Sequence, residues 1–229
     1  QEGYEQMNDR DRENAGQDGI AVACRLQPEL TRAELTEAAE RYHFGRTAKA
    51  GEAGGLSEVY ERLQKAVDCR AVYGLDEERR EAAAVITLGE HVDALQEEYQ
   101  RQGLLTEAYQ ADCLCRELLR KGNRVLDEVI RERAGLYAER YLFPGQNLPL
   151  EEMEGIFTRL EEGLRCGPAH GEGPARRIPV RLLPGYVLLP RQSVAYVIRL
   201  SESARTECAG ICAECERRES CESFAWPKA

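Results

Sequence analysis

The residues with the clearest chemical potential lie near the C-terminus, where four cysteines fall within fourteen positions. They are Cys208, Cys212, Cys215 and Cys221, with three, two and five residues between successive thiols. The two-residue spacing lets one tight turn bring two sulfurs to the same metal, and the other two cysteines complete four ligands. The set predicts a site for zinc or an iron–sulfur cluster, and the spacing does not choose between them. The alternative is an exposed tail whose thiols are reduced and unbound.

The other reactive side chains do not form a second site. Cys113 and Cys115 are two positions apart on a predicted helix, which puts them on different faces. Buried structural thiols are the better interpretation for both, and for Cys24, Cys69 and Cys166. The three histidines are far apart in the sequence, and no complete catalytic triad or phosphate-binding loop is present. Asp112 interrupts a run of small and apolar residues, so it is a candidate for a functional helical acid.

Composition restricts the classes of function. The 229 residues carry a formal charge of −10, which argues against an electrostatic grip on nucleic acid or on anionic lipid. No run of about 18 apolar residues occurs, so no segment is predicted to span a membrane. The polar, acidic N-terminus is unlike a secretory signal. The cysteines number nine, which is odd, and their spread does not resemble a disulfide framework, so we expect a protein of the reducing cytoplasm.

Hydrophobic spacing predicts several helices ahead of most of the strands. The helices cover 31–42, a segment starting at 57, 90–102, 106–133 and 151–164. Thr31 and Glu34 form a capping box at the start of the first helix, and Gly122-Asn123 is predicted to bend or break the long one. Short strands are predicted over 20–26 and 84–88, whereas 141–150, with two prolines, is predicted to be a loop.

Three strand-like runs follow, over 178–183, 186–189 and 193–200. Pro184-Gly185 suits a tight turn between the first two, and short links require antiparallel neighbours. The third run alternates in the way of a half-buried strand. We therefore expect an α+β fold in which helices pack on a small antiparallel sheet. This domain should occupy 19–203, between a loosely attached segment 1–18 and a cysteine-rich tail 204–229.

Three segments, in this order, resemble the activation domain of cobalamin-dependent methionine synthase, and more closely its short stand-alone relatives in anaerobic bacteria. The first is RYLFPGQNLPLEEMEGIF, in which Pro144, Gly145 and Pro149 match the family spacing. The second is VRLLPGYVLLPRQSVAYVI, which matches a Pro-x-x-Ser-Val strand start at Pro190, Ser193 and Val194. The third is the tail, since many short relatives end in a similar cysteine cluster. More weakly, AVITLGEHVDAL and LTEAYQADCLCRELL resemble an upstream strand and long helix of the family.

The resemblance implies a module that binds S-adenosylmethionine and caps the cobalamin of a partner corrinoid-dependent methyltransferase. In that family an external one-electron donor, such as a flavodoxin or ferredoxin, reduces oxidised cobalamin, and the sulfonium methyl group then traps the cobalt as methylcobalamin. The protein's task is to position the reactants, so no side-chain nucleophile is required.

The chain departs from the family pattern at some positions. Tyr141 stands where the family has its arginine, with Arg140 one step away, and Gln146 replaces the tyrosine after the glycine. The predicted S-adenosylmethionine site is Arg140, Pro144, Gly145 and Gln146, with Asp112 as an outside candidate. The alternative function is a non-enzymatic metal- or iron–sulfur-binding interaction protein that docks on a corrinoid protein.

Overall fold

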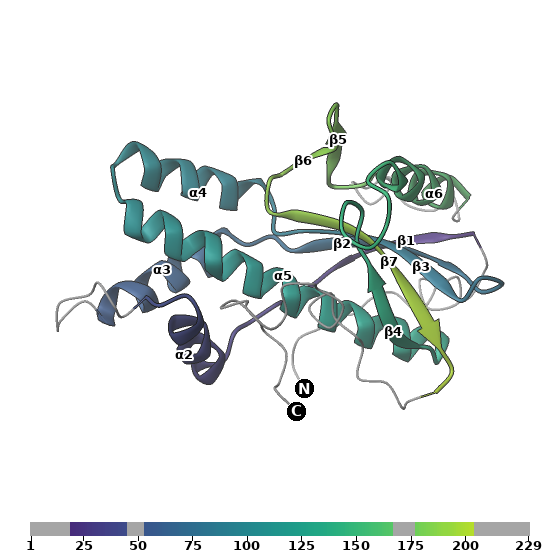
Figure 1. Cartoon of the computed structure of the whole chain (residues 1–229), viewed down its shortest axis with the longest axis horizontal. Coiled ribbons are helices and arrows are strands. Elements are labelled where there is room, and N and C mark those ends of the chain that lie inside the picture. The colour runs from purple at the N-terminus through teal and green to yellow at the C-terminus, as the bar shows by residue number, and fades with distance from the viewer. Residues whose placement is uncertain (1–18, 45–52, 167–176, 204–229) are drawn as a thin grey trace.

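An antiparallel sheet of five strands organises the protein (Figure 1). The structure is a computed structural model and describes residues 19–44, 53–166 and 177–203. The strand order is β1-β2-β3-β7-β4, and every neighbouring pair is antiparallel. The strands are β1 (Ala21–Arg25), β2 (Arg70–Asp76), β3 (Glu81–Thr87), β4 (Tyr137–Leu142) and β7 (Ser193–Ser201).

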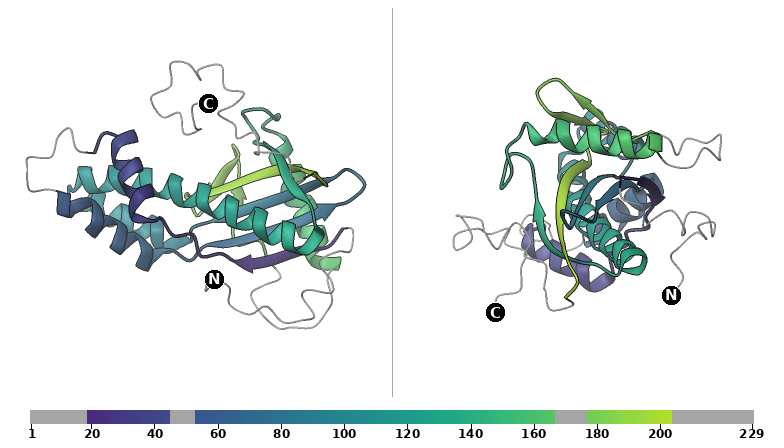
Figure 2. Two further views of the ribbon diagram at one scale, coloured as in Figure 1. Left: turned by 90° about the horizontal axis from the view of Figure 1, so that it is seen from below. Right: turned by 90° about the vertical axis from the view of Figure 1, so that its right-hand side faces the viewer.

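Both faces of the sheet are covered, which gives three layers (Figure 2). One face packs against α2 (Arg32–Arg41), α3 (Ala53–Ala66), α4 (Glu90–Arg101) and α5 (Leu105–Ala134). The other face packs against α6 (Glu152–Cys166) and the small hairpin of β5 (Arg181–Leu183) and β6 (Val187–Leu189). The expected α+β fold, with helices on an antiparallel sheet, is confirmed. Within the described residues, no helix is both long and apolar enough to cross a membrane.

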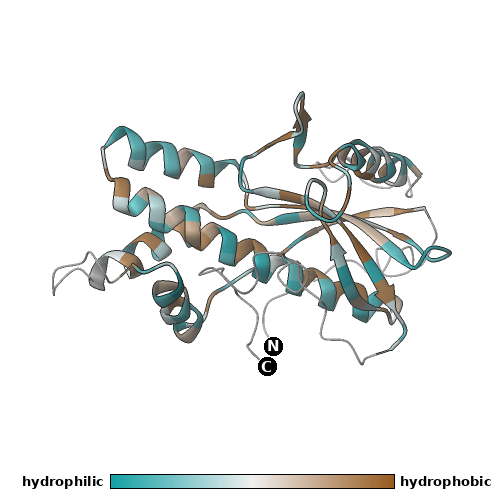
Figure 3. Cartoon of the chain, viewed as in Figure 1, coloured by the Kyte–Doolittle hydropathy of each residue, from teal (hydrophilic) through white to brown (hydrophobic). Residues whose placement is uncertain are grey.

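Strand β7 has apolar residues on both faces. Ala195 and Val197 contact the α6 layer, whereas Tyr196 and Ile198 contact the helices on the opposite face. All four are at most 3% exposed, so the prediction of a half-buried strand was wrong. The reason is that the alternate positions are also apolar, which suits the middle of a covered sheet. The helices differ from β7 because hydrophobic and hydrophilic residues alternate along them, as the brown and teal segments of Figure 3 show.

The expectation that the three C-terminal runs pair as consecutive antiparallel neighbours was right for the first two and wrong for the third. Strands β5 and β6 form a separate two-stranded sheet, and β7 lies between β3 and β4. The hairpin strands are three residues long, too short to extend a central sheet, whereas the nine residues of β7 pair along both neighbours. The turn at Pro184-Gly185 is confirmed, with the Tyr186 N–H donating to the Leu183 carbonyl at 3.1 Å.

Helix ends agree with the sequence better than helix interiors. At the start of α2 the Glu34 N–H donates to Thr31 Oγ1 at 3.2 Å, and the Thr31 N–H donates to Glu34 Oε2 at 2.8 Å, which confirms the capping box. The predicted break at Gly122-Asn123 was wrong, because α5 is continuous. Gly122 is buried against the sheet, where an added Cβ would lie 3.6 Å from Ile86, and this packing offsets the weak helix preference of glycine.

Two strands were not predicted. β2 lies in a segment that showed no clear alternation, and β4 extends to Leu142, inside the predicted 141–150 loop. The local signal of β4 is weak because two of its six residues, Glu139 and Arg140, are charged. Their pairing depends on partners distant in sequence, with β7 as the neighbour of β4.

Candidate functional site

The β4–α6 loop, residues 143–151, contains most of the predicted site. Asn147 closes it: its Oδ1 accepts the Phe143 N–H at 2.7 Å, and its Nδ2 donates to the Tyr141 carbonyl at 3.0 Å. The Gly145 N–H donates to the Leu148 carbonyl at 2.8 Å. Gly145 has a φ of 81°, a left-handed conformation that favours glycine. The result is a tight turn that holds Gly145 and Gln146 exposed to solvent.

The loop begins on the face of the sheet that α2, α3, α4 and α5 cover. Tyr141 and Phe143 form an aromatic cluster with Tyr196 of β7, with ring centroids 5.4 to 6.0 Å apart. The Tyr141 hydroxyl donates to Asp127 Oδ2 of α5. Beyond this root the loop passes to the other face, where Leu148 packs into the α6 layer, and it curls above the sheet on that side (Figure 1).

Arg140 is partly buried on β4 and is paired in register with Arg199 of β7. Next to this pair, the register shifts between Ala138 and Arg140, so the strand contains an irregularity at Glu139. Since Leu142 pairs with Val197 two positions further on, Arg140 and Leu142 lie on the α6 face of the sheet. Arg140, Pro144, Gly145 and Gln146 thus belong to one strand and the loop that continues it.

Asp112 lies elsewhere on α5. Its carboxylate accepts from Arg116 at 2.6 Å and from Gln192 Nε2 at 3.2 Å, and its side chain is 39% exposed. Fifteen residues separate it from Asp127, which corresponds to about 22 Å along a helix axis. The structure therefore does not place Asp112 beside the loop root. Both of its carboxylate oxygens already have partners within the protein. A ligand-binding role for Asp112 stays a prediction.

The loop and Gln192 nevertheless lie at the same end of the sheet. β4 and β7 are antiparallel, so the end of β4 points toward the start of β7, which Gln192 precedes. A hollow of about 480 Å³ opens at this end, between the start of α4 and the β5–β6 segment. Its lining combines opposite charges with apolar residues, including Arg70, Arg181, Asp93, Leu189 and Pro190.

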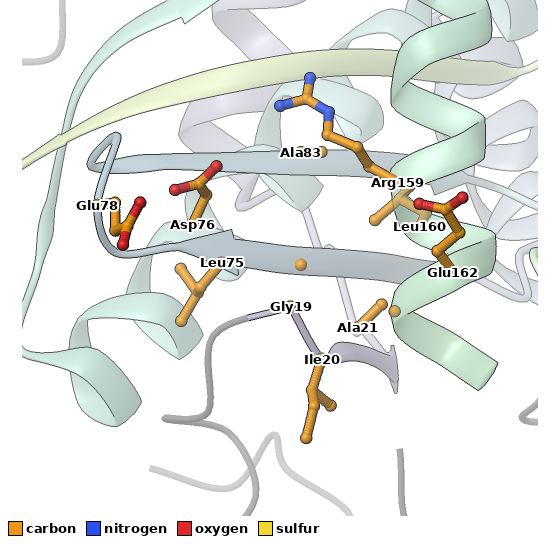
Figure 4. Close-up of a pocket in the computed structure, with 12 residues that line it drawn as sticks. Gly19, Ile20, Ala21, Leu75, Asp76, Glu78, Ala83, Arg159, Leu160 and Glu162 are labelled. Carbon is orange, nitrogen blue, oxygen red and sulfur yellow. The ribbon is translucent and has the colours of Figure 1, made fainter. Parts of the chain in front are cut away.

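The opposite end of the sheet has a second hollow, of about 440 Å³ (Figure 4). Small residues of β1, β2, β3 and α6 form its floor, and charged side chains surround it (Asp76, Glu78, Arg159 and Glu162). Gly163 of α6 makes the close approach possible, because an added Cβ there would lie 2.6 Å from the Ala21 nitrogen. This hollow is a product of close packing between α6 and β1, and it contains no residue of the predicted site.

The cysteine cluster of the tail, Cys208, Cys212, Cys215 and Cys221, lies outside the described residues. Of the other five cysteines, Cys24 is partly buried and Cys166 is exposed, so the prediction of a buried structural thiol was wrong for Cys166. Cys69, Cys113 and Cys115 are buried, and burial raises the pKa of the Cys69 thiol to about 12. In the ranges that the structure describes, no group of three or more His, Cys, Asp or Glu side chains could hold a metal ion.

The structure adds two residues that sequence reasoning missed. Asn147 fixes the loop and Asp127 anchors its root, although neither stood out in the sequence. An asparagine in a Pro/Gly-containing loop is a general turn signal, because its amide can bond nearby main-chain groups. Asp127 gave no such signal, since it sits in the run LDEVIRER, which looks like an ordinary amphipathic helix.

Comparison with known proteins agrees with this fold. No protein-family model matches the chain, and no curated protein matches it. Among solved structures, the chain is similar to the crystal structure of the MetH reactivation domain bound to AdoHcy. The similarity has a TM-score of 0.51 at 12% identity, and it covers 90% of this chain and 89% of that chain. The resemblance seen in the sequence is thus confirmed at the level of architecture: this chain has the fold of the MetH reactivation domain.

Proposed function

We propose that this protein is an S-adenosylmethionine-binding reactivation module for a corrinoid-dependent methyltransferase of the methionine synthase type. The observation that carries the proposal is the similarity over about nine-tenths of both chains to a reactivation domain bound to AdoHcy. AdoHcy is S-adenosylmethionine without its methyl group, so a protein that holds one has a surface suited to the other.

The β4–α6 loop supports a ligand site of this kind. Gly145 and Gln146 are exposed while their main chain is held by bonds within the turn. A rigid, exposed main chain next to glycine offers amide and carbonyl groups to a nucleoside or an amino-acid end without a side chain in the way. Arg140, in the strand that leads to the loop, would supply a cation for the ligand's carboxylate.

Bound S-adenosylmethionine would supply an electrophilic sulfonium methyl group, and the nucleophile belongs to the cobalamin of the partner. The chain itself then has to bind, orient and shield, which needs no catalytic triad. In this proposal the partner is a corrinoid-binding methyltransferase, a flavodoxin- or ferredoxin-like protein supplies one electron, and the setting is the cytoplasm.

Isothermal titration with S-adenosylmethionine and AdoHcy tests the proposal, using Gly145→Val and a matched control, Gly103→Val. Both glycines have positive φ, 81° and 73°, in exposed turns, so the substitutions impose similar backbone strain. Gly103 lies at the distant α4–α5 turn. We expect the wild type and Gly103→Val to bind, and Gly145→Val to give no detectable heat. Normal binding by Gly145→Val would remove the loop as the site, and a folded wild type without binding would remove the function.

A second candidate function rests on the four clustered cysteines of the sequence. In this alternative the protein is a non-enzymatic metal- or iron–sulfur-binding protein that docks on a corrinoid protein. Anaerobic purification with metal analysis and an absorption spectrum separates the cases. Broad visible sulfur-to-iron bands support a cluster, and a colourless protein that contains zinc supports a zinc site. A metal-free protein with four titratable thiols in the tail would contradict both.

A further inference from the structure

A series of side-chain contacts connects the β4–α6 loop to helix α5. Asn147 bonds to the main chain of both Tyr141 and Phe143, so its amide determines how the loop leaves the strand. The side chain of Tyr141 continues the connection on the other face, where its hydroxyl donates to Asp127. Loop, strand and helix are therefore joined through the side chains of Asn147, Tyr141 and Asp127.

Where this series of contacts reaches α5, it contains buried hydrogen-bond acceptors without partners among the described residues. Asp127 Oδ1 is buried and has no hydrogen-bond partner in the described part of the chain, and the same is true of Asn123 Oδ1. These residues are four positions apart on α5, so their side chains are neighbours on one helix face. Two acceptors side by side are unfavourable, whereas a proton on Asp127 supplies a donor at that place.

The surroundings of Asp127 favour that proton. Burial raises the pKa of Asp127 to about 7, with a contribution from Glu128, against the lowering effects of the Tyr141 hydroxyl and of Arg124. These charged and titratable neighbours come from β4 and from α5 itself. A protonated carboxyl still accepts from Tyr141 through its other oxygen, so the contact with the strand does not need the negative charge.

We propose that Asp127, Tyr141 and Asn147 are positioning residues that hold the β4–α6 loop in its ligand-binding shape. Asp127 does so as a neutral carboxylic acid. The ligand-binding part of this inference rests on the function proposed above. None of the three has to touch the ligand, because they act on the main chain of residues 143–148. Asparagine at position 127 reproduces the neutral acid, since its amide accepts from Tyr141 and donates toward Asn123, whereas leucine can do neither.

Amide hydrogen exchange followed by NMR on the full chain tests the inference without ligand. The reporters are the N–H groups of Phe143 and Gly145, which are bonded within the loop, and those of Val72 and Val85 in the buried sheet serve as the internal control. Loss of one bond should speed local exchange about fivefold. We expect faster exchange only in the loop for Asp127→Leu and Asn147→Ala, and wild-type exchange for Asp127→Asn.

Tyr141→Phe is the second test if Asp127→Leu does not fold, because it keeps the ring contacts with Phe143 and Tyr196 and removes only the hydroxyl. Titration with AdoHcy should show weaker binding by Tyr141→Phe and Asp127→Leu, with affinity restored in Asp127→Asn. Unchanged loop exchange in Tyr141→Phe and Asp127→Leu would overturn the inference. So would equal acceleration at Val72 and Val85, or an Asp127→Asn variant that behaves like Asp127→Leu.

The two proposals fail in different ways. If the wild type binds neither S-adenosylmethionine nor AdoHcy, but the exchange pattern follows the expectation, the proposed function is wrong and the role of the three residues in shaping the loop stands. If the wild type binds and the variants exchange and bind as it does, the function stands and the positioning role is wrong.

Discussion

Replacing Gly163 with alanine should destabilise the protein although alanine is the better helix former. A Cβ at this position would lie 2.6 Å from the Ala21 nitrogen, 2.8 Å from the Ala21 Cβ and 3.0 Å from the Gly19 carbonyl oxygen. Two of these atoms belong to the main chain, so no side-chain rotation can relieve the contact. Either α6 or β1 has to move, and α6 forms much of the core on its face of the sheet.

The magnitude follows from two opposing terms. Overpacking of this kind costs about 1–3 kcal/mol, and the severity of the contact places Gly163→Ala near the upper end. The helix preference of alanine over glycine returns about 1 kcal/mol. The net loss is about 2 kcal/mol, which corresponds to a melting temperature lower by about 4–8 °C in a chain of this size.

Gly155→Ala is the matched control in the same helix. Its added Cβ would lie 3.6 Å from Glu152 Oε2, an ordinary contact, so only the helix term applies. We expect a gain of about 1 kcal/mol and a melting temperature higher by about 2–4 °C. Thermal unfolding followed by circular dichroism measures both variants. If Gly163→Ala is as stable as Gly155→Ala, the close contact between α6 and β1 is not present in solution and the packing argument is refuted.

Three further predictions concern stability. Thr31→Ala removes one half of the capping box and should cost about 1 kcal/mol in urea unfolding, and an unchanged midpoint would show that the cap is not formed. The folded state keeps the proton of Asp127 to about pH 7, whereas an unfolded aspartate loses it near pH 4, so wild-type stability should fall between these values. Asp127→Asn should reduce that fall by about 4 kcal/mol, and equal pH profiles would contradict the assignment. Although burial opposes its charge, bonds from Tyr42, Arg120 and Arg41 lower the pKa of Glu117, so Glu117→Gln should cost about 2 kcal/mol at pH 7. This difference should shrink as the pH falls toward 3, where the wild-type carboxyl is protonated, and a constant difference would mean that its charge is not used.

Local signals predicted the elements whose stability is local. The capping box at Thr31 and the amphipathic stripes of α4 and α6 depend on residues within one or two turns, and the structure confirms them. Strands β2 and β4 depend on pairing with distant segments. A six-residue strand with two charged side chains looks like a loop until its neighbour β7 is known.

The candidate site shows the same division. Gly145 could be identified from its place beside a proline, since a turn with positive φ favours glycine. Asp127 could not, because its partner hydroxyl is fourteen positions away on a strand that was not predicted. The proton that we assign to it depends on burial, which no sequence pattern in α5 shows.

The central place of β7 has a consequence for how the molecule is made. Among the described strands β7 is synthesised last, yet it lies between two that leave the ribosome long before it. Until residue 193 and its successors emerge, β3 and β4 expose unpaired edges. The nascent polypeptide then carries a three-stranded sheet of β1, β2 and β3 and a separate strand β4, and both can adhere to other chains. Expression should therefore tolerate shortening after residue 203 far better than any stop before 193, and chaperone demand should be greatest in the interval before β7 is translated.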